Sequence, residues 1–273
     1  MRLSFHAAQP ERECRKPVSN PLPACRELQV AAVYHGARVG GDFYDFLQVK
    51  SRLLFVLLDI AGKRDEALHI AAVLQDVFAE QGADLFSRAD MNESDALSAL
   101  LLQMNRSLMA TAGGVRCAPG FIACYDQDIG TLTYCNAGHT PALLKDSQGI
   151  SSLEATGLPL GLFSHTIQDA NFSVLQPGAA LVLVSKGLVE SRSGAHEFGL
   201  DRVKQTVGAQ THGDAEDLCN QLLKEVVSFS ASPTHYGPAL HVPGFHHVAE
   251  PNDVTALALL RVPPASHVAV AGS

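Results

Sequence analysis

Two aspartates in the first quarter of the chain have the residue type and spacing of a divalent-cation site. Asp42 follows two glycines, and Asp59 ends an apolar run. Residues 42–49 alternate loosely between apolar and polar, residues 50–52 form a polar turn, and residues 53–58 are continuously apolar, which predicts an antiparallel hairpin. In such a hairpin Asp42 and Asp59 lie at the same end. Paired carboxylates in that position could bind Mg²⁺ or Mn²⁺, which prefer oxygen ligands.

The overall composition is that of an acidic globular protein. The 273 residues carry a formal net charge of −8, and the 20 Lys and Arg residues are scattered rather than clustered, which argues against a nucleic-acid surface. No apolar run approaches the roughly 18 residues of a membrane span. Residues 1–10 lack the apolar core of a signal peptide. We therefore expect a cytoplasmic protein that binds neither nucleic acid nor membrane.

The cysteines and histidines form no recognisable site. The 6 cysteines contain no C-x-x-C pair, which is typical of buried or idle thiols in a reducing compartment. Of the 12 histidines, 4 crowd the Pro- and Gly-rich segment 231–251, but their spacing matches no zinc motif. That segment is longer than an ordinary connection of about 4 to 6 residues. It is therefore interpreted either as a disordered insertion or as a flank of the site.

Hydrophobic periodicity predicts three helices among several short strands. Helical spacing begins near Asp65, recurs over residues 93–111 and returns over residues 215–229, with Asp214 as an N-cap. Further strands are expected at 29–34, 121–125, 132–135, 142–144, 174–175, 181–185 and 254–262. Strands clustered with short hairpin loops favour antiparallel sheets covered by helices over a repeated strand-helix-strand unit, so we expect an α+β sandwich.

One domain is expected, spanning residues 28–262 and containing the insertion at about 231–251. Residues 1–27 are polar and interrupted by prolines, as in a tail or the remnant of a linker, and residues 263–273 form a C-terminal tail. The sequence has no G-x-G-x-x-G, G-x-x-x-x-G-K-[ST] or G-x-S-x-G motif. Dinucleotide-binding, P-loop and nucleophile-elbow functions are therefore disfavoured.

Five short motifs occur in an order that resembles a known family. They are VGGDFYDF at 39–46, LDIAGK at 58–63, NAGHTP at 136–141, GLPLG at 157–161 and NDVT at 252–255. Together they resemble the SpoIIE-type phosphatases, a bacterial branch of the metal-dependent PPM (type 2C) serine/threonine protein phosphatases. The resemblance spans about residues 28–262. It implies an α-β-β-α sandwich of two mainly antiparallel sheets with a two-metal site at one end.

The resemblance also implies particular site residues. Asp42 and Asp59 match the first two metal-binding carboxylates, and the backbone carbonyl of Ile60 matches a carbonyl ligand. Taken alone, Asp42 is better explained as a residue that caps a turn beside two glycines, but the second motif reverses this preference and favours the ligand role. The implied ions are Mn²⁺ or Mg²⁺, which would activate water for attack on phosphorus without a protein nucleophile.

Two of the implied ligand positions depart from the family pattern. The family's T-D-G is Ser185-Lys186-Gly187 here, so a carboxylate is replaced by a cation. Two unit charges 4 Å apart interact by about 4 kcal/mol at an effective dielectric of 20, so Lys186 must turn aside or a metal must be absent. The family's D-D-x-T begins with Asn252, which leaves Asp253 as a partial substitute.

Two functions therefore remain open from the sequence. The first is a phosphatase that hydrolyses phosphoserine or phosphothreonine on a regulatory protein, for which the resemblance implies a STAS-domain anti-sigma-factor antagonist as substrate. The second is a pseudophosphatase that binds a phosphoprotein or signalling partner without hydrolysing it. Retention of Asp42, Asp59 and Asp253 favours the first. Lys186, whose ammonium can bind phosphate, and Asn252 favour the second.

Overall fold

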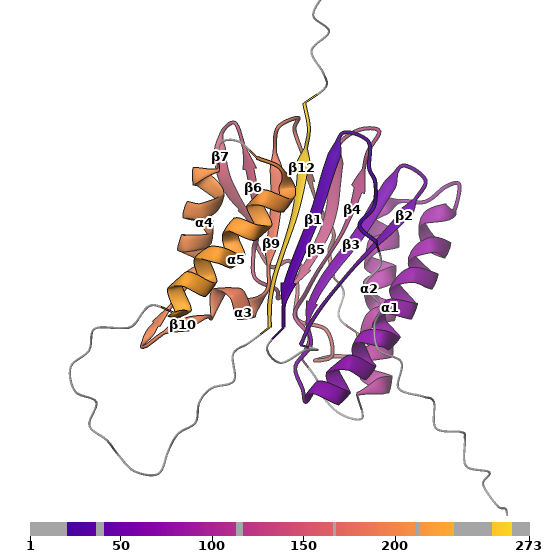
Figure 1. Ribbon diagram of the computed structural model, residues 1–273. Helices are drawn as coiled ribbons and strands as arrows, with labels where there is room; N and C mark the ends of the chain where they lie inside the picture. The colour runs from indigo at the N-terminus through magenta and orange to yellow at the C-terminus, as the bar shows by residue number, and fades with distance from the viewer. Residues whose placement is uncertain are drawn as a thin grey trace, which may run out of the picture.

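The computed structural model describes residues 21–36, 41–112, 117–165, 168–210, 213–231 and 253–263. Within these ranges two five-stranded antiparallel sheets face each other, and helices cover both outer surfaces (Figure 1). The layers run helix, sheet, sheet, helix, which confirms the expected α+β sandwich. The segment 232–252, which holds most of the expected insertion and Asn252, lies outside the described residues.

The first sheet, here called the hairpin sheet, contains the two strands inferred from the aspartate motif. Its strands in spatial order are β2 (Asp42–Val49), β3 (Arg52–Asp59), β4 (Gly120–Asp126), β5 (Thr131–Ala137) and β8 (Asn171–Val174). β2 and β3 are joined by a tight turn in which Val49 pairs with Arg52. The expected hairpin is therefore confirmed, with its turn at the end opposite the aspartates.

The second sheet, here called the terminal-strand sheet, brings together the first and last strands of the chain. Its strands in spatial order are β1 (Leu28–His35), β12 (Val254–Arg261), β9 (Ala180–Val184), β6 (Ala142–Asp146) and β7 (Gly149–Leu153). β12 lies between β1 and β9 and is antiparallel to both. The residues just before β12 therefore lie at the same end as the exit of β9.

The helices are divided between the two sheets (Figure 1). α1 (Arg64–Ser87) and α2 (Glu93–Thr111) cover the hairpin sheet, and α4 (Gly199–Ala209) and α5 (Ala215–Ala231) cover the terminal-strand sheet. One short helix, α3 (Lys186–Val189), follows β9 directly and leads into the small ribbon of β10 (Arg192–Ser193) and β11 (His196–Glu197). No helix in the described ranges has the length and apolar character needed to cross a membrane.

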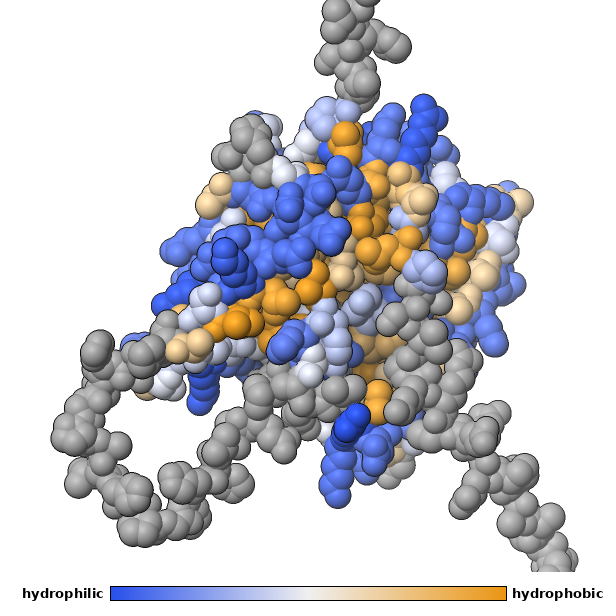
Figure 2. All heavy atoms as spheres, viewed as in Figure 1, coloured by the Kyte–Doolittle hydropathy of each residue, from blue (hydrophilic) through white to orange (hydrophobic). Residues whose placement is uncertain are grey.

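The apolar run of β3 is continuous because both of its faces are buried. Its successive side chains point to opposite faces of the sheet. One set, Leu54, Val56 and Leu58, packs under α1 and α2, and the alternate set, Leu53, Phe55 and Leu57, fills the space between the sheets. A third core lies between the terminal-strand sheet and α4 and α5. In Figure 2 the outward face of α5 is hydrophilic, as this packing requires.

The expected pairing of the strands within residues 174–185 needs correction. Residues 174–185 read as strand, turn, strand, yet β8 pairs with β5 while β9 pairs with β6 and β12. The turn thus carries the chain from one sheet to the other. The two glycines that follow the expected helix at 93–111, Gly113 and Gly114, lie outside the described residues. The expected N-cap of α5 is confirmed, because Asp214 Oδ1 accepts the Asp217 N–H at 2.8 Å.

Arg52 ties β3 to its neighbours through two carboxylates. Its Nε lies 2.6 Å from Glu93 Oε1, and its Nη2 lies 3.2 Å from Asp126 Oδ2. Arg52→Met would leave two largely buried carboxylates without this cation, so we expect it to lower the free energy of unfolding by about 2–3 kcal/mol in urea denaturation. As a control, Arg88→Met removes only an exposed pair with Asp84 and should cost less than about 1 kcal/mol. Equal losses in the two variants would contradict a special role for burial.

Candidate active site

The two hairpin aspartates meet at the open end of the hairpin. Asp42, the first residue of β2, pairs directly with Asp59, the last residue of β3. The ladder continues past this pair, because the Ile60 N–H donates to the Gly41 carbonyl at 2.6 Å. The chain thus holds two carboxylates side by side at a fixed register.

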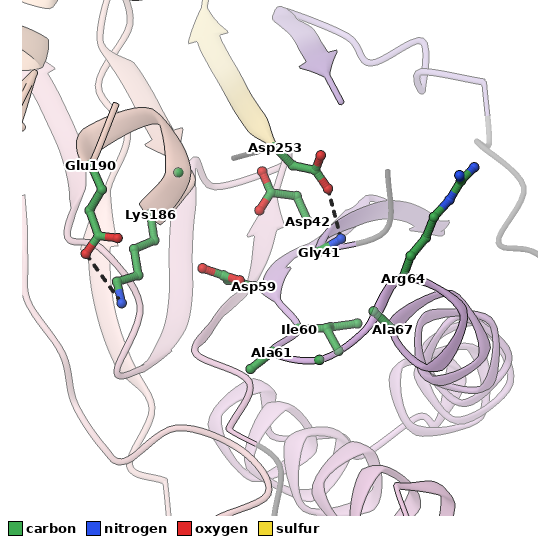
Figure 3. Close-up of a pocket in the computed structure, with 12 residues that line it drawn as sticks. Gly41, Asp42, Asp59, Ile60, Ala61, Arg64, Ala67, Lys186, Glu190 and Asp253 are labelled. Carbon is green, nitrogen blue, oxygen red and sulfur yellow. Dashed lines mark hydrogen bonds and ion pairs between the residues drawn. The ribbon is translucent and has the colours of Figure 1, made fainter. Parts of the chain in front are cut away.

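A third aspartate reaches this end from the other sheet. Asp253 directly precedes β12, and its Oδ2 accepts the Gly41 N–H at 2.9 Å. From the same strand, Thr255 Oγ1 donates to Asp42 Oδ2 at 2.7 Å. These bonds join the start of β2 to the start of β12, as Figure 3 shows for Asp253 and Gly41. The site therefore lies where the two sheets meet.

Ser185 supports this arrangement from the end of β9. Its Oγ accepts the Thr255 N–H at 3.0 Å, and its own N–H donates to the Thr255 carbonyl at 3.0 Å. Both residues are completely buried. Through Thr255, which donates to Asp42 Oδ2, these bonds hold the Asp42 carboxylate from the protein interior. The sequence pattern gives no sign of this role beyond the position of both residues inside short motifs.

A cavity of about 240 Å³ opens beside the aspartates. Its charged lining residues are Asp42, Asp59, Asp253, Glu190, Lys186 and Arg64. In Figure 3 the Arg64 side chain points away from the three aspartates. Carboxylates therefore dominate the charge that faces the cavity.

Burial raises the pKa of Asp42 to about 7. Hydrogen bonds from Thr255 and Ser185 act in the opposite direction, and the neighbouring charges of Asp59 and Asp253 raise the pKa further. A carboxylate shifted in this way is one whose charge is incompletely balanced by its surroundings. A cation at this position would relieve the imbalance.

The donor set fits a hard divalent cation held by few protein ligands. Mg²⁺ usually keeps several waters and is bound through one or two carboxylates together with substrate phosphate. Asp42 and Asp59 offer two carboxylates, and Ile60 lies at the edge of the same cavity. In the described part of the chain, no three His, Cys, Asp or Glu side chains are gathered closely enough to form a complete metal cage. The described residues therefore offer Asp42 and Asp59 as a carboxylate pair for such a cation.

Lys186 stands at the position where the family pattern has a carboxylate. Its side chain is directed along α3 toward Glu190. Its Nζ lies 3.4 Å from Glu190 Oε1, one helical turn further on. Both side chains lie on the α3 side of the cavity (Figure 3). This is one of the two outcomes expected from the sequence, in which the ammonium is directed aside. Glu190 was not expected to take part, although its i,i+4 spacing from Lys186 is a usable signal.

The NAGHTP motif builds a turn near the site rather than part of its lining. Asn136 Oδ1 accepts the His139 N–H at 2.8 Å, and Asn136 Nδ2 donates to the Leu153 carbonyl at 3.1 Å. Gly138 has a φ of 69°, and a Cβ there would lie 2.6 Å from Pro159 Cδ, so only glycine is accommodated. The two motifs that contain Gly138 and Pro159 are thus packed against each other.

His139 is a buried group whose protonation should oppose folding. Burial lowers its pKa to about 4, and its Nδ1 lies 3.0 Å from the Thr140 carbonyl. Between its unfolded pKa of about 6.5 and a folded pKa near 4, the unfolded state binds the extra proton, so stability falls as pH falls through this window.

We expect His139→Gln to remove this part of the acid dependence. The difference in unfolding free energy between wild type and the variant should shrink by up to about 3 kcal/mol from pH 7.5 to pH 4. Urea denaturation across this pH series measures it, and His196→Gln, at an exposed histidine, serves as the control. A difference independent of pH would show that His139 can be charged in the folded protein.

The sequence of this chain is similar to those of known bacterial proteins. The family model of Stage II sporulation protein E (SpoIIE) matches residues 50–235, more than half of the chain. The chain belongs to the SpoIIE family. Among curated relatives, Protein IcfG of Synechocystis sp. is 27% identical over 219 residues, which are 72% of this chain and 34% of IcfG. The phosphoserine phosphatase RsbU of Bacillus subtilis is 26% identical over 175 residues, which are 63% of this chain and 50% of RsbU.

Solved structures share the fold of this SpoIIE-family chain. The PP2C phosphatase domain of SpoIIE from Bacillus subtilis, solved with a fragment of its regulatory domain, has a TM-score of 0.66 at 14% identity, covering 86% of this chain and 64% of that one. The SiaA-PP2C domain of Pseudomonas aeruginosa also has a TM-score of 0.66 at 14% identity, covering 85% and 84%. The chain spans half or less of the curated relatives that it matches. Asp42 and Asp253 flank the segment matched by the family model.

Proposed function

We propose that this SpoIIE-family chain is a metal-dependent protein phosphatase that hydrolyses phosphoserine or phosphothreonine on a regulatory protein. The observation that carries the proposal is the direct pairing of Asp42 with Asp59 at the mouth of an acidic cavity. Two relatives that are themselves phosphoserine phosphatases, RsbU and RsbP of Bacillus subtilis, support the reaction class.

Each residue has a distinct part in the proposed mechanism. Asp42 and Asp59 would hold a Mn²⁺ or Mg²⁺ ion, with the Ile60 carbonyl, Asp253 and Asn252 as further candidate ligands. The bound ion would lower the pKa of a bound water molecule and would offset the charge on the phosphoryl oxygens. Thr255 donates to Asp42 Oδ2 at 2.7 Å, which would hold the Asp42 carboxylate in place at the cavity lining.

The test is titration of metal into protein stripped with a chelator. Calorimetry with Mn²⁺ and with Mg²⁺ measures binding, and the same samples are assayed with p-nitrophenyl phosphate and with a phosphoserine peptide. The proposal expects saturable binding and hydrolysis that both return on adding metal. A folded protein that binds neither ion and hydrolyses neither substrate would overturn it.

A pseudophosphatase is the second candidate, and two observations favour it. No three-carboxylate cage exists within the described residues, and Lys186 lines the cavity on the side opposite Arg64. Such a protein would bind the phosphoserine peptide with an affinity independent of metal. The titration described above therefore separates the two candidates.

The substrate, the location and the domain bounds of the proposed phosphatase are further parts of the proposal. We propose a phosphorylated STAS-domain protein as the substrate, as the motif resemblance implies, and the likeness to the phosphoserine phosphatase RsbU supports a phosphoprotein substrate. We also propose a cytoplasmic location and a phosphatase domain spanning residues 28–262, whose first and last strands, β1 and β12, pair with each other. Incubation with phosphorylated candidate STAS proteins, followed by intact mass measurement, tests the substrate class.

A further inference from the structure

Lys186 is placed to act on a ligand in the cavity. It follows Ser185, which is bonded to β12 in both directions, so the backbone of Lys186 is firmly held. Its side chain, in contrast, is 56% exposed. A fixed Cα with a solvated ammonium allows the charge to move over several ångströms without disturbing the fold.

The contact that holds the ammonium aside is weak. Lys186 Nζ lies 3.4 Å from Glu190 Oε1, and the Glu190 side chain is 42% exposed. Exposed pairs at i,i+4 contribute only about 0.3–0.5 kcal/mol, and a lysine that precedes its glutamate is in the less favourable order. A phosphate dianion, which offers three oxygens and a larger charge, would compete successfully for this ammonium.

The cavity needs such a cation if it is to receive phosphate. Four carboxylates line it, from Asp42, Asp59, Asp253 and Glu190. One divalent ion would leave an excess of negative charge facing an incoming dianion. Two cations line the cavity: Arg64 points away from the aspartates in Figure 3, and Lys186 lies across from Arg64 on the α3 side, where Glu190 holds its ammonium. The charge balance therefore requires it to turn toward the ligand.

We propose that Lys186 is the phosphoryl-binding cation of this site and that Glu190 holds its ammonium aside until phosphate enters. The inference rests on the proposed function for its choice of ligand, but not on turnover. Lys186 would then supply positive charge to the phosphoryl oxygens, which a carboxylate at this position could not do. The single substitution of a carboxylate by lysine is then compatible with a working site.

Phosphate affinity tests the proposal without any need for hydrolysis. Inorganic phosphate and O-phosphoserine are titrated calorimetrically into the full chain with saturating Mg²⁺ and again after chelation. Lys186→Met should weaken phosphate binding at least about 10-fold, whereas Lys186→Arg should stay within a few fold of wild type. Glu190→Gln should strengthen binding about 2-fold, since it removes the competing partner. Lys63→Met, the same charge change just outside the cavity lining, is the matched control.

Opposite signs for Lys186→Met and Glu190→Gln distinguish ligand binding from a structural role, which would move both in the same direction. Unchanged phosphate affinity in Lys186→Met, with an unaltered melting temperature, would overturn the proposal. So would a loss of equal size in Lys63→Met. If no variant hydrolyses phosphoserine but binding follows the expected pattern, the proposed phosphatase activity fails and the role of Lys186 stands.

Discussion

Asp59→Asn should abolish metal-dependent hydrolysis and metal binding together. Asp59 is directly paired with Asp42 across the hairpin, so its replacement removes one of the two paired carboxylates that would hold the divalent ion. A metal ion contributes several kcal/mol to phosphoryl transfer, and a loss of about 4 kcal/mol corresponds to about 10³-fold in kcat. Hydrolysis of p-nitrophenyl phosphate and Mn²⁺ calorimetry on the same samples measure both effects.

The matched control for this variant is Asp128→Asn. Asp128 lies in the turn between β4 and β5, and β3 pairs with β4 so that this turn is at the far end from Asp59. The same loss of one negative charge there should leave kcat and metal affinity within about 2-fold. Wild-type turnover by Asp59→Asn would show that the hairpin aspartates are not the catalytic pair.

The arrangement of the aspartates could be predicted from sequence because local rules determine it. A tight polar turn between two strands fixes their register, and the register places Asp42 opposite Asp59. The helix at 93–111 was likewise predicted with its observed ends, because its apolar residues keep a regular period and Asn92 caps it by accepting the Asp95 N–H. Short-range patterns of this kind need no knowledge of the rest of the fold.

Other features could not be predicted because they depend on contacts between distant segments. α4 was not expected, since it buries only Val203 and Val207 and its stability comes from packing against its neighbours. The separation of β8 and β9 into different sheets is decided by which sheet edge each strand can reach. The direction of Lys186 depends on Glu190, whose exposed side chain carries no hydrophobic signal.

The position of the site between the sheets has a mechanical consequence. Asp42 belongs to the hairpin sheet, whereas Asp253 and Thr255 belong to the start of the terminal-strand sheet. A cation held by aspartates from this junction would therefore join the two halves of the sandwich. Binding of the ion should consequently be visible as stability of the whole fold, and not only as catalysis.

This coupling leads to the second large effect, in which Asp42→Asn stabilises the metal-free protein. Asp42 is desolvated and lies near two other carboxylates, which raises its pKa to about 7. At pH 8 its charge therefore opposes folding, and asparagine removes that charge while keeping an oxygen that can accept from Thr255. We expect the free energy of unfolding in chelator to rise by about 1–2 kcal/mol.

Metal should reverse the order of stability, so that wild type becomes more stable than Asp42→Asn. At about 100 times the dissociation constant, an ion that binds only the folded state adds about 2.7 kcal/mol to wild type and nothing to Asp42→Asn. Asp45→Asn on the same strand is the contrasting variant, because Asp45 accepts from the Gln75 side chain at 3.1 Å and should lose about 1 kcal/mol with or without metal. Thermal melts of the three proteins in chelator and in Mn²⁺ measure this. If Asp42→Asn is instead destabilised and is still stabilised by Mn²⁺ as much as wild type, the ion binds elsewhere.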